Sequence, residues 1–233
     1  MSLIGTVRPK VLCSLGAMAA IGGLMVAASA QAQEREQNLL NDAQATLVDF
    51  KNDEEFPGFE SQLAKAKAVL VVPSLTKASF IVGGEGGSGV LLARDGSEVG
   101  WSYPAFYKVT AGSVGLQIGA QEAETVFMIM TEEGLRKLMS DEHKLGVDAG
   151  AAVVDAGSGV EGSTTTNLGG DIVAYARSEG LYLGASFEGA VVSPDEAANQ
   201  AYYGANATPE AILADAGVQN AAADPLRAVL KGS

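Results

Sequence analysis

The sequence predicts an α+β domain built on a curved, largely antiparallel sheet. The first observation behind this class is the order of the segments: a helical stretch, many short apolar runs with one helical insertion, then further helices. A parallel sheet would show regular strand–helix alternation instead. The second is composition, since 29 glycines accompany only 7 prolines in 233 residues, which favours tight turns between short strands. So many short strands are compatible with strong curvature or a partial barrel.

An export leader is predicted at the N-terminus, over residues 1–32. Arg8 and Lys10 precede an uncharged run over residues 11–30, and Ala30-Gln31-Ala32 then gives the small-x-small pattern that signal peptidase cleaves. We expect cleavage after Ala32 and an exported protein, periplasmic or associated with an outer membrane. The apolar run is also long enough to be kept as a membrane anchor, and this alternative stays open.

Removal of the leader leaves an acidic chain without cysteine. Cys13 is the only cysteine, and it lies in the apolar run, so the mature chain would have no disulfide, thiolate nucleophile or cysteine-bound metal. The formal charge of −13 becomes −15, because the leader carries Arg8 and Lys10 and no acid. Such a charge excludes nucleic acid as a partner. We expect no cofactor and no metal.

The first half of the mature chain predicts one helix followed by strands. Residues 33–53 place apolar side chains at helical spacing. A strand over residues 68–72 is expected to stop at Pro73, and the glycine-rich residues 83–89 are expected to join two strands. Two further strand predictions follow in the chain, an alternating segment at residues 113–121 and an apolar one at residues 126–130.

The second half predicts an inserted helix over residues 131–139, more strands, and C-terminal helices. The strands are expected at residues 146–154, 171–177 and 181–190. Ser193-Pro194 predicts a capped helix start that runs to Gly204, and Thr208-Pro209 and Asp224-Pro225 repeat the cap-then-proline pattern. We therefore divide the chain into a leader (1–32), one domain (33–204) and a short helical tail (205–233).

No motif in the chain predicts catalysis. Residues 84–89 fit G-x-G-x-x-G, but an apolar strand pattern follows where a dinucleotide site needs a helix. His143, the only histidine, lies in a polar stretch with no adjacent nucleophile, so a solvated loop residue is the simpler interpretation. We expect a non-enzyme, with no catalytic residues; a hydrolase that uses His143 is the alternative to test.

Two features predict contact with an amphiphile. No acid occurs between Glu60 and Glu85, which makes a locally basic segment in a strongly acidic chain. Four of the 14 aromatic residues fall within residues 101–107, and such a cluster suits either a lipid pocket or a packed core. The candidate headgroup and apolar contacts are Lys65, Lys67, Lys77, Trp101, Tyr103 and Phe106.

Several of these segments together resemble successive motifs of the SYLF (Ysc84-like) family, over about residues 39–204. The segments are residues 66–74, 83–92, 100–106, 112–121, 144–149, 175–181, 193–196 and 201–204. The resemblance implies a lipid-binding domain; eukaryotic relatives bind phosphoinositide membranes, and fungal ones are linked to actin. Eukaryotic members use a basic N-terminal segment for membrane binding, whereas the first helix here carries Glu34, Glu36, Asp42 and Asp49.

The functional expectation is a non-catalytic lipid- or phospholipid-binding module of the cell envelope, of an exported, bacterial type. The acidic first helix makes phosphoinositide specificity doubtful and an actin partner improbable. Its protein partners are unknown. The alternative is a structural or protein-interaction scaffold in the periplasm, whose glycine-rich strands form a rigid platform.

Overall fold

A computed structural model describes residues 15–79, 82–114, 119–140, 143–144, 151–155, 171–178, 190–214 and 218–233. Cys13 lies outside these ranges, as do residues 181–189 of the strand predicted at 181–190 and residues 146–150 of the segment 146–154. The helices are α1 (Leu15–Asn52), α2 (Phe59–Leu63), α3 (Glu132–Ser140), α4 (Glu196–Tyr203), α5 (Pro209–Leu213), the 3-10 turn η1 (Ala221–Ala223) and α6 (Asp224–Leu230). The strands are β1 (Ala68–Ser79), β2 (Val82–Ala93), β3 (Ala105–Val114), β4 (Gly119–Ile129), β5 (His143–Lys144), β6 (Ala151–Asp155), β7 (Ile172–Ser178) and β8 (Val191–Pro194).

Within the described ranges, eight strands form one sheet in the order β5-β8-β3-β2-β1-β4-β7-β6. Neighbouring strands run antiparallel except β6 and β7, which are parallel. The predicted α+β class with a largely antiparallel sheet is confirmed. In the part of the chain that the structure describes, β5 and β6 are the two edges, so the sheet is not closed into a barrel.

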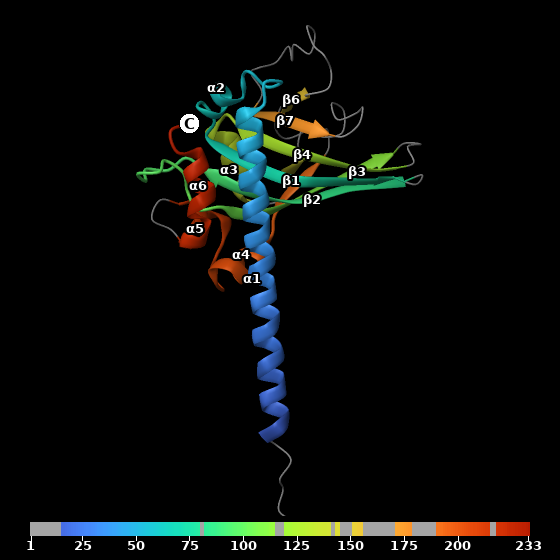
Figure 1. Cartoon of the computed structure of the whole chain (residues 1–233), viewed down its shortest axis with the longest axis vertical. Helices are drawn as coiled ribbons and strands as arrows, with labels where there is room; N and C mark the ends of the chain where they lie inside the picture. Colours follow the sequence, from blue (N-terminus) through green and yellow to red (C-terminus); the bar gives the residue numbers. More distant parts are fainter. Residues whose placement is uncertain are drawn as a thin grey trace, which may run out of the picture.

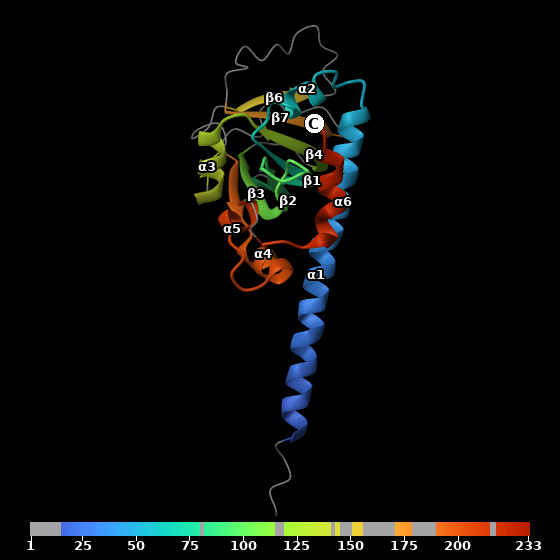
Figure 2. The same cartoon turned by 90° about the vertical axis from the view of Figure 1, so that its left-hand side faces the viewer.

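Helices cover both faces of this sheet (Figures 1 and 2). Side chains of a strand alternate between the two faces, so each face presents its own apolar side chains to the helices that cover it. Val69 and Val71 of β1 pack into a cluster with α1, α2, α4 and α6, whereas Leu70 and Val72 pack into a second cluster with α3 and α5. The near-continuous apolar runs of the central strands follow from this burial on two sides.

The glycine-rich segment lies inside β2, so the prediction that it joins two strands is wrong, and β1 continues past Pro73. The β1–β2 register shifts between Val71 and Ser74, which marks a bulge around the proline. A Cβ atom on Gly89 would lie 2.6 Å from the carbonyl oxygen of Val71, and one on Gly87 would lie 2.6 Å from that of Ser74. These two glycines let the bulged strand approach its neighbour.

The single strand predicted at residues 113–121 is also wrong. β3 ends at Val114 and β4 begins at Gly119, with residues 115–118 outside the described part. β3 pairs with β2, whereas β4 pairs with β1, so the two halves of the alternating segment belong to different strands of the sheet. Alternation gives the face on which a residue lies and carries no information on where the chain reverses.

The observed helix N-termini agree in part with those predicted from the sequence. The inserted helix α3 is found where it is predicted, and Thr208 caps α5 by accepting the backbone N–H of Ala211. The predicted Ser193 cap is wrong, because Ser193 belongs to β8 and Asp195 is the N-cap of α4. Asp224 is also not a cap, since it is the first residue of α6 and follows a 3-10 turn.

The C-terminal residues pack into the body. Leu226 and Leu230 of α6 are buried in the cluster that contains α1. Arg227 donates two hydrogen bonds to the carbonyl oxygen of Trp101, at 3.0 and 2.8 Å, and lies over the Tyr103 ring. The segment predicted as a tail therefore supplies core side chains, although its division from the domain stays a prediction.

α1 is long, and its N-terminal half extends away from the body (Figures 1 and 2). From residue 31 onward, where its side chains are described, the first buried one is Glu36, followed by Leu40, Ala43 and Leu47. Within the described part of the chain, no helix is long and apolar enough to span a bilayer.

Candidate functional site

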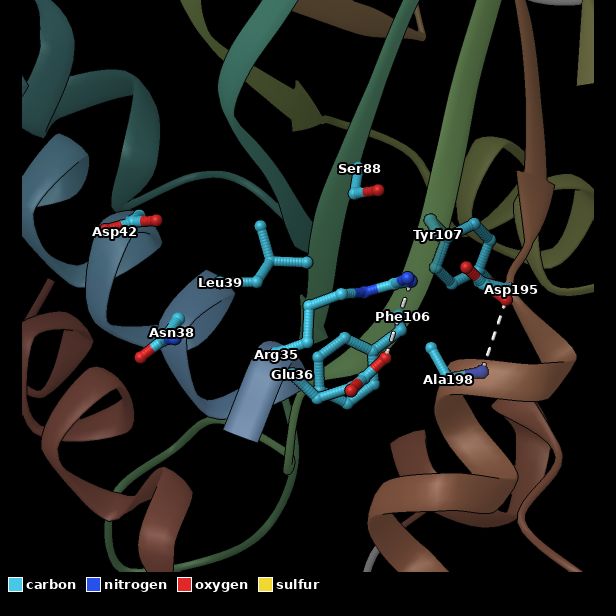
Figure 3. Close-up of a pocket in the computed structure, with 10 residues that line it drawn as sticks. All are labelled: Arg35, Glu36, Asn38, Leu39, Asp42, Ser88, Phe106, Tyr107, Asp195 and Ala198. Atoms are coloured by element: carbon cyan, nitrogen blue, oxygen red, sulfur yellow. Dashed lines mark hydrogen bonds and ion pairs between the residues drawn. The ribbon is translucent and has the colours of Figure 1, made fainter. Parts of the chain in front are cut away.

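The candidate site is a cavity of about 290 Å³ between α1, α4 and the strands β2 and β3 (Figure 3). Three acids, one base and several apolar side chains share its lining, as expected of a site for a small ligand with a polar end. The lining residues are Arg35, Glu36, Asn38, Leu39 and Asp42 of α1, Ser88 of β2, Phe106 and Tyr107 of β3, and Asp195 and Ala198 at the start of α4. We call this the α1–α4 cavity.

Glu36 is the most unusual group in the cavity. It is only 4% exposed, and its Oε2 atom has no hydrogen-bond partner. Its Oε1 atom lies 3.7 Å from the guanidinium of Arg35, which is itself mostly exposed. A pair at this distance is a weak ionic contact, so the buried carboxyl is only partly compensated.

Burial raises the pKa of the Glu36 carboxyl above its ordinary value. The nearby charge of Asp195 raises the same pKa further, whereas the backbone N–H of Glu36 and the charge of Arg35 act in the opposite direction. The surroundings thus disfavour the ionised carboxylate unless a further donor or cation reaches it.

Asp195 lies across the cavity from α1 and is fully engaged. Its Oδ1 atom accepts the backbone N–H of Ala198 at 3.2 Å and so caps α4. Its Oδ2 atom pairs with Lys108 of β3 at 2.9 Å. The acid is 4% exposed, and these two partners compensate its charge in a way that Glu36 lacks.

The wall formed by Phe106 is held rigidly. The backbone N–H of Phe106 donates to Oδ1 of Asn199 at 2.8 Å, and its carbonyl accepts from Nδ2 of Asn199 at 3.0 Å. Asn199 is fully buried, and the Phe106 ring packs edge-on against Tyr202 at 5.3 Å. α4 is therefore fixed to β3 at the cavity, which keeps the wall in place without a ligand.

The cavity lacks the groups of a familiar hydrolytic site. Its lining includes the hydroxyls of Ser88 and Tyr107 but no histidine. Across the described ranges, no group of three or more His, Cys, Asp or Glu side chains is placed to hold a metal ion. The side chain of His143 lies outside the described part, so a role for it stays untested.

The six lipid-contact candidates do not form one surface. Trp101 and Phe106 are buried, and Tyr103 is half-buried beneath Arg227. Trp101 and Phe106 belong to the core cluster on the α1 face of the sheet, and Tyr103 packs against the clusters on both faces. Phe106 also lines the cavity. The aromatic side chains of this segment are therefore part of the packed core or in contact with it.

The lysines lie elsewhere. Lys65 is exposed just after α2, and Lys67 pairs with Glu132 at 3.1 Å. The side chain of Lys77 lies outside the described part. Lys65 is not among the residues that line the α1–α4 cavity, and Figures 1 and 2 place α2 and α4 at opposite ends of the body. The lipid-binding role of the six residues stays a prediction.

Sequence reasoning missed the charged groups of the cavity, although one signal was available. Glu36 extends the series Leu40, Ala43, Leu47 and Phe50 by one helical turn, with spacings of four and three residues. A charged residue at a position that the helical period assigns to the core indicates a buried carboxyl. The Asp195–Lys108 pair joins distant segments and has no such local signal.

A family model described as "Las17-binding protein actin regulator", named Ysc84, matches residues 110–233 of the chain. This match covers more than half of the 233 residues. The chain belongs to the Ysc84 family. The SYLF resemblance read from the motifs is thereby confirmed.

Curated relatives of this Ysc84-family chain come from fungi and vertebrates. The chain is 31% identical over 187 residues to "Protein YSC84" of Saccharomyces cerevisiae, a match that covers 78% of the chain and 39% of that relative. It is 30% identical over 174 residues to "LAS seventeen-binding protein 3" of the same yeast, covering 72% and 37%. It is 31% identical over 144 residues to "SH3 domain-containing YSC84-like protein 1" of Xenopus laevis, covering 61% and 42%. The match spans about two fifths of each relative.

The expectation that an actin partner is improbable is wrong for the family to which this chain belongs. The description of the matching Ysc84 model names both Las17 binding and actin regulation, and a yeast relative is named for binding Las17. The acidic first helix was the reason for that expectation, and a helix charge argues only against anionic surfaces. The description of the family model and the name of one yeast relative refer to binding or regulation, and none of the four names refers to a reaction.

Proposed function

We propose that this chain is a non-catalytic module that binds lipid headgroups at a membrane surface of the cell envelope. The observation that carries the proposal is the α1–α4 cavity, which combines charged groups with the apolar side chains of Leu39, Phe106 and Ala198. A lining of this kind suits the polar end of an amphiphile, and it includes no histidine to activate a nucleophile. Membership of a family whose model and one yeast relative are named for binding supports the non-catalytic part.

Flotation with vesicles tests this proposal. The chain beginning at Gln33 is mixed with vesicles of phosphatidylcholine alone, or with added phosphatidylethanolamine or phosphatidylglycerol, and centrifuged through a density gradient. We expect the protein to rise with at least one vesicle type. Ser88→Leu, which would fill the cavity from β2, should leave the protein at the bottom. Thr110→Leu, at an exposed strand position outside the lining, should float as wild type does. A wild-type protein that stays at the bottom in every gradient would reject lipid binding.

The lysine candidates are tested in the same gradients. Lys65→Glu, Lys67→Glu and Lys77→Glu together reverse the basic segment, and they should reduce flotation only with anionic vesicles if this segment meets headgroups. Glutamate at position 67 would also face Glu132, so Lys67→Gln is the milder variant. Unchanged flotation of the triple variant would remove these residues from the site and leave the cavity proposal in place.

A protein-interaction scaffold is the second candidate, and the description of the family model favours it. The chain corresponds to about two fifths of the yeast relatives, so the partners of those whole proteins are not transferred to it. Co-sedimentation of the mature chain with actin filaments, without lipid, separates this candidate from the first. Saturable pelleting by a folded chain would support the scaffold, and its absence would count against actin as the partner.

A further inference from the structure

We infer that the α1–α4 cavity binds a primary ammonium group, such as that of an ethanolamine headgroup, with Glu36 as its counter-ion. The inference rests on the proposed function, because it takes a headgroup as the occupant. It goes further by naming the chemistry of that headgroup and the residue that selects it.

The starting observation is the carboxylate itself. A buried carboxyl oxygen without a hydrogen-bond partner destabilises a folded protein, because it has lost its bonds to water and gained none in return. Glu36 is 96% buried, lines the cavity and leaves Oε2 unpartnered. A ligand that donates a hydrogen bond and carries a positive charge removes this cost when it binds.

The charges around the cavity favour one added cation. The acids that line it are Glu36, Asp42 and Asp195, and the bases within reach are Arg35 and Lys108. Lys108 is already committed to Asp195 at 2.9 Å, and Arg35 approaches Glu36 only to 3.7 Å. The three acids therefore outnumber the two bases by one, and Glu36 has the longer of the two ionic contacts.

The size and the walls limit the ligand further. At about 290 Å³ the cavity lies near the lower end of the range for small-molecule sites, so it suits a headgroup and excludes an acyl chain. Leu39, Phe106 and Ala198 provide apolar contacts for the two methylenes of ethanolamine. An aromatic ring close to the charge also favours a cation.

The need for a donor separates primary from quaternary ammonium. A primary ammonium has three N–H groups, one of which can satisfy Oε2 of Glu36. The quaternary nitrogen of choline has none, so choline would leave the oxygen unpartnered. The cavity should therefore discriminate phosphatidylethanolamine from phosphatidylcholine, two lipids of the same net charge. The exposed guanidinium of Arg35 at the rim is placed to meet the phosphate that both carry.

The test uses vesicles and free headgroups in parallel. Binding of the mature chain is measured on phosphatidylcholine vesicles with and without phosphatidylethanolamine, and by calorimetry with O-phosphoethanolamine and phosphocholine. We expect binding to the ethanolamine forms, and Glu36→Gln should weaken it about tenfold or more. Glu34→Gln, which removes the same charge from an exposed position two residues away, should bind as wild type does. Ser88→Leu, which blocks the cavity and keeps Glu36, should also abolish binding.

Each outcome separates this inference from the proposed function. Equal binding to vesicles with and without phosphatidylethanolamine, unaffected by Glu36→Gln, would overturn the ammonium site while lipid binding stands. Binding of free O-phosphoethanolamine that depends on Glu36, with no vesicle binding, would support the ammonium site and reject the lipid surface. Absence of binding in both arms, by a folded protein, would reject both.

Discussion

At the scale of single residues, the buried carboxyl of Glu36 lies in surroundings that oppose its ionised form. Burial raises the pKa of its carboxyl, so ionisation is less favourable in the folded chain than in the unfolded chain. Functional groups are often held in such unfavourable surroundings. Arg35, Asp42, Asp195 and Lys108 are the charged groups that surround it, and Asp195 opposes its ionisation.

This cost predicts a stabilising substitution. Glu36→Gln should raise the stability of the ligand-free chain at pH 7 by about 1 kcal/mol, which is roughly 2–4 °C in Tm for a domain of this size. A raised carboxyl pKa lowers wild-type stability as pH rises through the ordinary value of 4.5 toward neutrality. The advantage of the variant should therefore vanish near pH 4. Thermal melts at both pH values measure it, with Glu34→Gln as control. A variant that is less stable at pH 7, or equally improved at both pH values, would contradict this account.

Gly89 and Gly86 lie in the same strand but differ in the space that a Cβ atom would have. Alanine at position 89 would place Cβ 2.6 Å from the Val71 carbonyl and 2.8 Å from a methyl of Val72, so the bulged strand would have to move. We expect Gly89→Ala to destabilise the fold by about 1–3 kcal/mol. At Gly86, in the same strand, the nearest atom lies 3.8 Å away, and Gly86→Ala should change stability little. Urea unfolding measures the free energy of unfolding of both variants. Equal losses of stability would exclude a steric role for Gly89, because they would show that the substitution of either glycine has the same effect.

At the scale of secondary-structure elements, local patterns predicted the helices better than the strands. The periodicity of residues 33–53 and of residues 131–139 is a property of one helix face, and both helices are confirmed. Pro73 and the glycines of residues 83–89 were interpreted as breaks because both residue types weaken a strand in isolation. The bulge in β1 and the close approach of β2 reverse that interpretation, and both depend on a neighbouring strand.

The same limit applies to the candidate site. Glu36 carries a local signal because it interrupts a helical apolar series. Lys108 and Asp195 meet only because β3 pairs with β8 and α4 follows directly, with Lys108 opposite Ser193 in the ladder. The sequence allows Trp101 and Phe106 to serve either a lipid surface or the core, and the structure packs both side chains in the cluster that contains α4 and α6. Composition alone does not specify which helix covers an aromatic cluster.

The contacts that hold α6 against the body give the prediction at the scale of secondary-structure elements. Arg227 is buried and donates two hydrogen bonds to the Trp101 carbonyl, pairs with Asp224 at 3.0 Å and lies 4.0 Å from the centre of the Tyr103 ring. Lysine keeps the charge but has no planar fork for the paired bonds. Arg227→Lys should cost about 1.5–3 kcal/mol and speed amide hydrogen exchange in α6 before the rest of the body. Arg136→Lys, at an exposed position of α3, is the control. Unchanged exchange in α6 would show that its leucines alone hold it.

At the scale of the whole molecule, the buried part of α1 begins just after the predicted leader. Gln33, Glu34 and Arg35 are exposed, and Glu36 is the first buried side chain among residues 31–52. A chain that begins at Gln33 therefore keeps the core contacts described for α1, and its Tm should equal that of the full chain. A clearly lower Tm would show that residues before Gln33 stabilise the body, and it would argue against their removal in the mature protein.

Processing itself can be followed in a bacterium that has both inner and outer membranes. Signal peptidase needs small residues at the first and third positions before the cut, which Ala32 and Ala30 supply. The mass of the exported protein should match a chain that begins at Gln33. Ala30→Phe should block the cut and leave the full-length chain in the membrane pellet, held by the uncharged run over residues 11–30. If the wild-type chain is also recovered at full length in that pellet, the apolar run is an anchor, and it holds the α1–α4 cavity close to the bilayer throughout the life of the protein.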